Sequence, residues 1–375
     1  MNEELCLRSL GDLMEWDDEE ARAEYQWLWV ASRFKYDRYR DYVAGSRFLE
    51  HLLIWLGQFE LVSERAIAYR FVRHRLVYFS PAELNKLIEL FYFEVVQHNI
   101  IQHVSTKLHI KPQLVWANAD ARKEYDKLKR QTLFMGLSDG AHMELVRYAA
   151  KGALSNEQIV GTTQIDVDKW MDVRKELRDA LGEPTARFTT VYAIDDFTGS
   201  GTSLIRRPAG EPWKGKLIKL RNSISAAQEA LGENIFDENY ELRIHHYIAS
   251  EQARDNISKQ LQKVHEEPPE KGWFSNVQVT YGMPLNASHK LDETLDSEFL
   301  SIADKYYDQA IEEPVRHHLE QSGIDHLRRG YSGCALPLVL DHNTPNNSIT
   351  LLWESSDGKS GPAMRPLFPR RQRHA

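Results

Sequence analysis

The sequence predicts an α/β protein: a mostly parallel β-sheet flanked by helices, preceded by an α-helical N-terminal domain. Residues 1–111 carry apolar residues at helical spacing, whereas short apolar runs typical of strands begin after residue 112. These runs alternate with helical patterns, which is the order that parallel sheets require. Because 375 residues exceed the size of an average domain, we expect two domains, 1–111 and 112–375.

Helical signals dominate the N-terminal domain. In residues 46–59 ("SRFLEHLLIWLGQF") the apolar side chains recur on one helical face. Ser80, Pro81 and Glu83 form a capping box with proline at the first helical position. Residues 64–80 ("ERAIAYRFVRHRLVYFS") predict a helix that leads into a short strand, so a winged-helix-like fold is one form that this domain could take.

A basic cluster lies within this helical region, although the chain as a whole has a net charge of -8. That charge argues against attraction of nucleic acid to the whole surface but leaves room for a local patch. We interpret the cluster as a solvated helix face, and contact with nucleic acid or another partner stays open. Its members are Arg65, Arg70, Arg73, His74 and Arg75.

Cysteine content and hydropathy predict a cytoplasmic protein. Cys6 and Cys334 show neither metal-ligand nor redox spacing, which fits a reducing compartment. Residues 1–25 are acidic and have no apolar core, so we expect no secretory signal. No apolar run approaches the roughly 20 residues of a membrane span, so we expect no membrane partner.

Five apolar runs after residue 112 predict the strands of the sheet. Helical patterns lie between them, and this alternation argues for a mostly parallel sheet. In residues 241–250 apolar and polar side chains alternate, and we expect only one of His245 and His246 to face inward. The predicted strands are residues 133–139, 187–195, 241–250, 276–285 and 334–340.

The most informative stretch is residues 189–205, "TTVYAIDDFTGSGTSLI". A buried strand is followed at once by Asp195 and Asp196, and ligands of α/β sheets bind beyond such strand ends. The next residues offer hydroxyl groups and amides that can surround a phosphate, and a following helix would add its positive N-terminus. Two carboxylates beside them can accept hydrogen bonds from vicinal hydroxyls, so we expect a ribose 5-phosphate ligand. The loop residues are Thr198, Gly199, Ser200, Gly201, Thr202 and Ser203.

Two common phosphate motifs do not fit this stretch. A P-loop requires a lysine directly after its glycines, and none follows here. A dinucleotide-binding fingerprint places its glycines first and its acid about 20 residues later, the reverse of the order seen here.

Residues 191–203, "VYAIDDFTGSGTS", resemble the phosphoribosyl pyrophosphate (PRPP) motif of type I phosphoribosyltransferases. The resemblance implies a phosphoribosyltransferase-like sheet in which Asp195 and Asp196 contact the ribose hydroxyls and residues 198–203 hold the 5-phosphate. It also implies PRPP or a nucleotide as the substrate, with Mg²⁺ bound through substrate oxygens and no dense cage of protein ligands.

The same family has a pyrophosphate loop on an earlier strand. Ser138, Asp139 and Gly140 in "FMGLSDGAH" are the candidates for this loop, with Arg147 as a possible contact to pyrophosphate. A plain helix-entry turn, with Ser138 or Asp139 as the N-cap, explains the residues equally well.

A third segment, residues 336–353, contains "DHNTPNN" between two apolar runs. It is either an Asn- and Pro-rich turn or a site that reads a base or sugar edge through His342, Asn343, Asn346 and Asn347. Its "HNTPNN", Trp353 and the "PLFPR" at residues 366–370 resemble a prokaryotic branch of phosphoribosyltransferase-like proteins. That branch is associated with antiphage systems, including those encoded beside retron reverse transcriptases, which would make such a complex a candidate partner of the N-terminal domain.

Two functions are compatible with these residues. The first is an effector enzyme that acts at the ribose C1 atom, as a phosphoribosyltransferase or as a nucleotide N-glycosidase. The second is a catalytically inactive sensor that binds a phosphoribosyl ligand and regulates a partner.

Overall fold

The protein is described from a computed structural model covering residues 3–43, 45–269, 273–316, 319 and 326–370. The chain forms two compact units, one made of Met1–Glu83 with Asn286–Ala375 and the other of Leu84–Leu285. Within the described residues, no helix has the length and apolar character that crossing a membrane requires.

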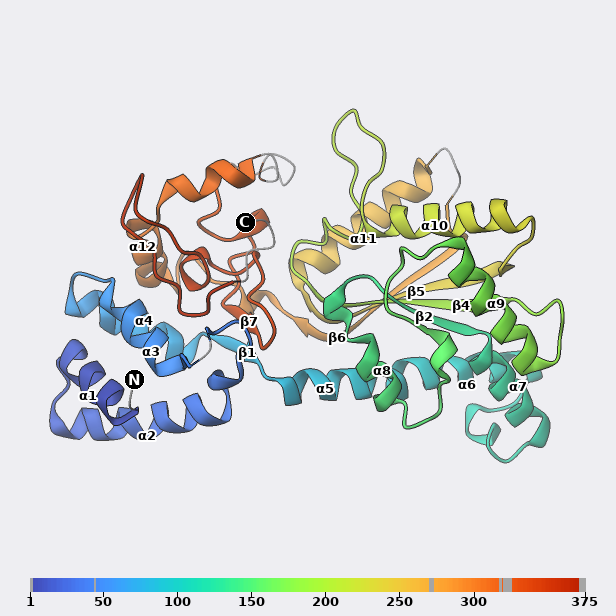
Figure 1. Ribbon diagram of the computed structural model, residues 1–375, viewed down its shortest axis with the longest axis horizontal. Helices are drawn as coiled ribbons and strands as arrows, with labels where there is room; N and C mark the ends of the chain where they lie inside the picture. The colour runs from blue at the N-terminus through green and yellow to red at the C-terminus, as the bar shows by residue number, and fades with distance from the viewer. Residues whose placement is uncertain (1–2, 44, 270–272, 317–318, 320–325, 371–375) are drawn as a thin grey trace. The chain divides into compact units, whose positions relative to one another are not determined.

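The second unit contains a five-stranded sheet in the order β3-β2-β4-β5-β6, and every neighbouring pair is parallel (Figure 1). The predicted α/β fold with a mostly parallel sheet is therefore confirmed. Four of the five predicted strands belong to this sheet. The fifth member is the short β3, which was not predicted and forms the edge next to β2. The strands are β2 (Thr132–Gly136), β3 (Ile159–Val160), β4 (Phe188–Thr198), β5 (Phe236–Ser250) and β6 (Asn276–Leu285).

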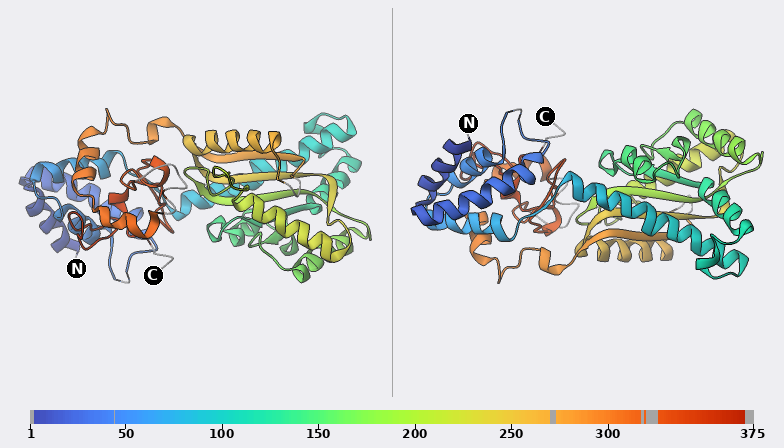
Figure 2. Two further views of the ribbon diagram at one scale, coloured as in Figure 1. Left: turned by 90° about the horizontal axis from the view of Figure 1, so that it is seen from above. Right: turned by 90° about the horizontal axis from the view of Figure 1, so that it is seen from below.

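Helices cover both faces of this sheet, as Figures 1 and 2 show. On one face the apolar side chains of the strands pack with α9 (Val167–Leu181), α10 (Lys216–Leu231) and α11 (Glu251–Glu266) in one core. On the other face lies the helical run formed by α5 (Pro81–Leu90), η2 (Phe91–Gln97) and α6 (His98–Leu108). Helix α7 (Ala119–Arg130) packs against α6, and α8 (Met143–Ala149) comes after β2.

Phe91 shows how the second face is closed. Its ring lies 6.4 Å from that of Phe134 on β2, 5.4 Å from Tyr192 on β4 and 4.4 Å from His245 on β5, measured between centroids. These three residues belong to one face because side chains alternate along each strand.

The first unit combines the N-terminal helices with the C-terminal part of the chain. Its helix α4 (Val62–His74) leads into β1 (Val77–Phe79), as predicted, and β1 pairs in parallel with β7 (Leu338–Leu340). Buried residues from both parts of the chain form one core. The helices are α1 (Glu3–Met14), α2 (Asp18–Phe34), α3 (Phe48–Gly57), α4 (Val62–His74) and α12 (Ser297–Lys305), with short turns η1 (Tyr36–Arg38), η7 (Gln309–Val315), η8 (Tyr331–Gly333) and η9 (Thr350–Leu352).

This division differs from the single boundary at residue 111 that the sequence led us to expect. Residues 84–111 pack on the sheet of the second unit, because the ring of Phe91 and the helix α6 are part of its cover. The strand expected at residues 334–340 pairs with β1 in the first unit, so it is not a member of the large sheet.

Candidate phosphoribosyl site

The two acids lie within β4, three and two residues before its end at Thr198, so the strand runs further than predicted. Neighbouring side chains of a strand point to opposite faces, which separates Asp195 from Asp196. Asp195 contacts Lys216 of α10 and is 2% exposed, whereas Asp196 is half-buried on the opposite face, against Gly140 of the loop after β2.

Asp195 joins three elements. Ser138 Oγ donates a hydrogen bond to its Oδ1 atom from the loop after β2, and Lys216 Nζ donates to its Oδ2 atom from the start of α10. Burial raises the pKa of Asp195 to about 6, an effect that the neighbouring Lys216 opposes and Asp196 reinforces. The carboxyl group is therefore poised to change its charge just below neutral pH.

Asp196 lies against the predicted pyrophosphate loop. A Cβ atom at Gly140 would collide with the Asp196 carboxylate, so any larger residue there would displace the Asp196 side chain. In the same loop, the carbonyl of Ala141 accepts a hydrogen bond of 3.2 Å from the hydroxyl of Tyr247 on β5. The structure thus brings Ser138 and Gly140 together with both acids.

The other two residues predicted for pyrophosphate, Asp139 and Arg147, do not join the acids in this way. Asp139 is exposed at the start of η4 (Asp139–Ala141). Arg147 lies on α8, where its guanidinium donates to Asn156 Oδ1 and to the Tyr148 hydroxyl, each at 3.2 Å. The guanidinium of Arg147 therefore already has two hydrogen-bond partners in the protein, Asn156 and Tyr148.

The loop at residues 198–203 is built against the N-terminus of α11. Gly201 has a φ of +75°, and a Cβ atom there would lie 2.9 Å from the carbonyl oxygen of Ala253. Ser250 Oγ donates to the carbonyl of Gly199 at 2.5 Å, and Asn256 Nδ2 donates to that of Ser200 at 2.8 Å. These bonds use the carbonyl groups of the loop and hold them toward α11.

Donor groups of the same loop are left without protein partners. Within the described chain, the amides of Ser200 and Gly201 donate no hydrogen bond, and the buried Thr198 Oγ1 has none. Ser200 Oγ and Thr202 Oγ1 share a bond of 2.9 Å, while Ser203 is exposed. Amides and a hydroxyl in one short loop are the groups that bind phosphate oxygens.

The helix predicted to follow the loop begins only at Lys216, after an excursion over residues 204–215 that Arg206 and Lys214 close through a β-bridge. The chain then returns, so that the Lys216 amide donates to the Ser203 carbonyl at 3.0 Å and the Leu217 amide to the Leu204 carbonyl at 3.1 Å. Two of the first amides of α10 are therefore already used by the chain itself.

Two residues of this region were not predicted from the sequence. Lys216 is separated from the motif by the excursion, and no local pattern connects it with Asp195. His246, paired in register with Asp195, is 1% exposed, and burial lowers its pKa to about 3. Both His245 and His246 are buried, so the expectation that only one faces inward was wrong: helices cover both faces of β5.

The segment at residues 342–347 lies in the first unit, where it forms turns after β7. Asn347 Nδ2 donates to the carbonyl of Tyr331 at 3.1 Å and to Cys334 Sγ at 3.3 Å. The Asn346 carbonyl accepts from the Tyr331 amide at 2.6 Å. Its other two candidates are partly exposed: His342 Nδ1 lies 3.3 Å from Asp341 Oδ1, and the buried Oδ1 of Asn343 has no hydrogen-bond partner within the described chain.

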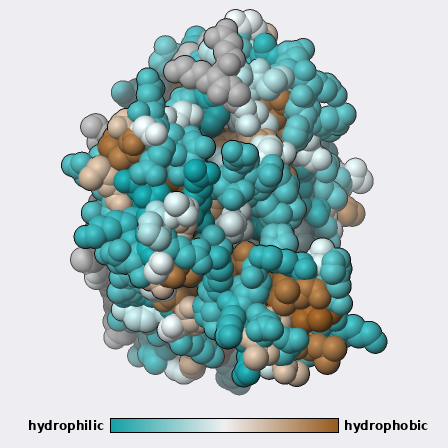
Figure 3. Space-filling view, turned by 90° about the vertical axis from the view of Figure 1, so that its right-hand side faces the viewer, coloured by the Kyte–Doolittle hydropathy of each residue, from teal (hydrophilic) through white to brown (hydrophobic). Residues whose placement is uncertain are grey.

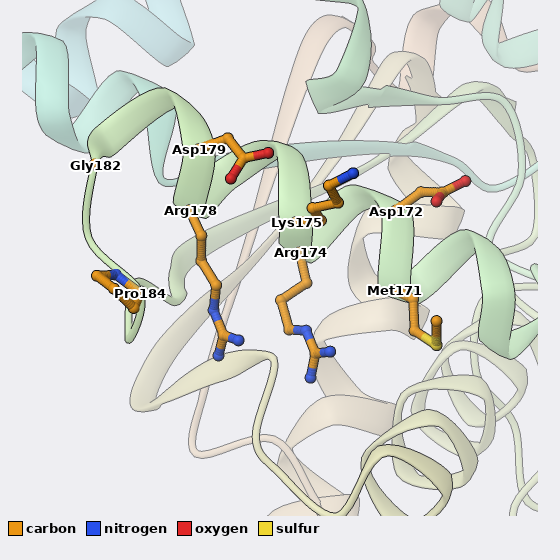
Figure 4. Close-up of a pocket in the computed structure, with 8 residues that line it drawn as sticks. All are labelled: Met171, Asp172, Arg174, Lys175, Arg178, Asp179, Gly182 and Pro184. Atoms are coloured by element: carbon orange, nitrogen blue, oxygen red, sulfur yellow. The ribbon is translucent and has the colours of Figure 1, made fainter.

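A surface groove along α9 offers a different hollow, shown in Figure 4. None of its lining residues was predicted for ligand binding, and Arg174 and Arg178 both pair with Glu233. Elsewhere, the face in Figure 3 is mostly hydrophilic, with hydrophobic residues gathered in small areas. The groove is lined by Met171, Asp172, Arg174, Lys175, Arg178, Asp179, Gly182 and Pro184.

A parallel sheet with two acids near a strand end, followed by a loop whose amide and hydroxyl donors are unpaired within the described chain, is the arrangement expected of a protein of the phosphoribosyltransferase type. The comparison with family models agrees: the model of the PRTase-CE family matches residues 52–370, and the chain belongs to that family. No curated protein and no solved structure matches the chain.

Proposed function

We propose that the second unit binds a ribose 5-phosphate group, presented by PRPP or by a nucleotide, and acts at the ribose C1 atom. The observation that carries the proposal is the loop after β4: within the described chain, the amides of Ser200 and Gly201 and the hydroxyl of Thr198 have no protein partner, and they follow directly after two carboxylates. In a member of a phosphoribosyltransferase-type family, such a loop is suited to the 5-phosphate.

The two acids have different parts in this proposal. Asp196, half-buried beside Gly140, would accept a hydrogen bond from one ribose hydroxyl. Asp195 would accept from the second and, when ionised, stabilise positive charge on the sugar. Ser138, which already donates to Asp195, links this contact to the loop proposed for pyrophosphate.

With PRPP, the bond between C1 and the pyrophosphate oxygen would break through an oxocarbenium-like state while an acceptor attacks C1. Most of the rate enhancement would come from holding the sugar and stabilising charge. Mg²⁺ would arrive with the substrate and be held mainly by its oxygens and by water. With a nucleotide, the same site would break the N-glycosidic bond instead, with water or another acceptor attacking.

The alternative is a sensor that binds the phosphoribosyl group without turnover. One observation favours it: Arg147, the cation predicted for the leaving group, is held by Asn156 and Tyr148. A sensor would use the second unit to bind its ligand and regulate a partner.

The biological setting is also part of the proposal. The resemblance of "HNTPNN", Trp353 and residues 366–370 supports a role as an effector of antiphage defence in the cytoplasm, of the kind encoded beside retron reverse transcriptases. Binding of nucleic acid or of such a complex through the N-terminal helices has weaker support, because Arg70, Arg73 and Arg75 pair with acids of the first unit. A salt-dependent affinity for nucleic acid would support it.

Turnover tests the central proposal. The protein is incubated with Mg²⁺ and either PRPP or a mixture of nucleotides, and pyrophosphate, free base and ribose phosphate are quantified. We expect product from the wild type and none from Asp195→Asn combined with Asp196→Asn. The control is Asp172→Asn combined with Asp179→Asn, which removes two exposed carboxylates of α9 and should change nothing. Binding without product would favour the sensor, and full activity of the Asp195/Asp196 variant would refute the site.

A further inference from the structure

The cation that contacts Asp195 comes from outside the motif. Lys216 is the first residue of α10, and its ammonium group donates to the Oδ2 atom of the buried carboxylate. Ser138 occupies Oδ1, so both carboxylate oxygens are oriented by the chain.

Lysine is an unusual choice at this position. The N-terminus of a helix carries partial positive charge, so acids are favoured in its first turn and cations are disfavoured. α10 has no acid in its first turn, and its N-cap, Gly215, contributes no side-chain bond. A residue placed against the local preference of its helix points to a function of its own.

We propose that Lys216 is a positioning residue for Asp195: its ammonium group keeps the buried carboxylate ionised and oriented to accept a hydrogen bond from a ligand hydroxyl. The inference rests on the proposed function for the identity of that ligand. Lys216 lies beyond the excursion at residues 204–215, and within the described chain its ammonium group donates to Asp195 and to no group of the loop at residues 198–203.

Burial disfavours the ionised form of Asp195, because water no longer solvates its charge. The groups that face it have opposing effects. Asp196, its neighbour on β4, disfavours the charge, while Lys216 from α10 and Ser138 from the loop after β2 favour it. From β5, His246 is kept uncharged by burial and Tyr247 by burial and by the nearby acids, so neither supplies a positive charge. Among the described neighbours Lys216 is the charged group that favours ionisation, and burial still holds the pKa of Asp195 above its usual value, at about 6.

The test follows the titration of Asp195 directly, in the ligand-free protein. The ¹³Cγ signal of Asp195, assigned by its loss in Asp195→Asn, is recorded as a function of pH. Lys216→Met should raise its midpoint by about 1–3 pH units, the usual effect of removing a close opposite charge. Lys216→Arg keeps the positive charge, so its midpoint should lie close to that of the wild type. Lys219→Met removes the same charge from an exposed site one turn along α10 and should leave the midpoint unchanged.

A second measurement connects this titration with binding. The affinity for ribose 5-phosphate is measured between pH 5 and pH 9, and its loss at low pH should follow the Asp195 midpoint in each variant. An unchanged midpoint or an unchanged acid limb in Lys216→Met overturns the role of Lys216. If the wild type binds no ribose 5-phosphate at any pH, the proposed function fails, while the titration still decides whether Lys216 controls the ionisation of Asp195.

Discussion

The loop after β4 and the segment at residues 342–347 are both rich in hydroxyl and amide groups, and they use these groups in different ways. In the loop, carbonyl oxygens are bound by Ser250 and Asn256, while the amides of Ser200 and Gly201 point to no protein partner within the described chain. The chain has fixed the loop and kept its donors available.

The segment at residues 342–347 uses most of its groups to hold the first unit together. Thr344 Oγ1 lies 2.9 Å from the Tyr39 hydroxyl and donates to the Phe368 carbonyl at 3.2 Å. Asn347 Nδ2 reaches Tyr331 and Cys334. A composition rich in Asn and Thr is thus no guide to a ligand site by itself, and what distinguishes the two regions is whether the polar atoms already have partners.

The candidate site also affects stability, because burial in the folded protein disfavours the charge of Asp195. Asp195 has a pKa of 3.8 in its ordinary state and about 6 when folded. The folded protein therefore binds more protons between these values, and the Asp195 contribution to the free energy of unfolding falls as pH rises through this range.

The largest effect that we expect follows from this linkage. Asparagine at position 195 has no proton to lose, so Asp195→Asn should gain stability relative to the wild type as pH rises. The difference in unfolding free energy, variant minus wild type, should grow by about 1–3 kcal/mol between about pH 4 and pH 7. Denaturant titrations at both pH values measure it, with the exposed Asp172→Asn as the control. A difference that stays constant with pH would show that burial does not disfavour the charge of Asp195.

The second prediction concerns the first unit. Thr344→Val removes a fully buried hydroxyl that lies between Tyr39 and Phe368. Because the Phe368 carbonyl loses this donor, the free energy of unfolding should fall by about 1–3 kcal/mol. The affinity for ribose 5-phosphate should stay within about two-fold, since the hydrogen bonds of the Thr344 hydroxyl, to Tyr39 and to Phe368, both lie in the first unit. A loss of affinity at unchanged stability would instead assign Thr344 to a ligand site.

Much of the second unit could be predicted from local patterns. Apolar runs indicated β2, β4, β5 and β6, and the alternation with helices indicated their parallel arrangement. The acids and the loop were recognised because their chemistry lies within a few consecutive residues. β3 has only two residues and leaves too weak a pattern to detect.

The remaining features depend on contacts between residues far apart in the chain. The pairing of β1 with β7 joins residues 77–79 to 338–340, and nothing in either short run specifies the other. The contact of Lys216 with Asp195 depends on how the excursion at residues 204–215 returns to the loop. The burial of both His245 and His246 depends on α5, η2 and α6 covering the second face, which alternation within one strand does not reveal.

The smallest expected effect gives the sharpest form of the comparison, because it repeats the change made at Thr344 in the other region. Thr198→Val removes a buried hydroxyl that has no partner within the described chain. An unpaired buried hydroxyl does not stabilise the fold, so the free energy of unfolding should change by less than about 0.5 kcal/mol or rise slightly. If the hydroxyl donates to the 5-phosphate, the affinity for ribose 5-phosphate should fall about ten-fold, as expected for a hydrogen bond to a charged group.

Ribose without the phosphate serves as the control ligand for Thr198→Val, since its weaker binding should not change. The pair of valine variants then gives opposite results for one chemical change: stability is lost at position 344 and affinity at position 198. If Thr198→Val destabilised the protein as much as Thr344→Val and left the affinity intact, the loop would be held together by its hydroxyl groups in the same way as residues 342–347. The phosphate would then have to bind through the amides of Ser200 and Gly201 alone, and the distinction between the two regions would rest on the backbone.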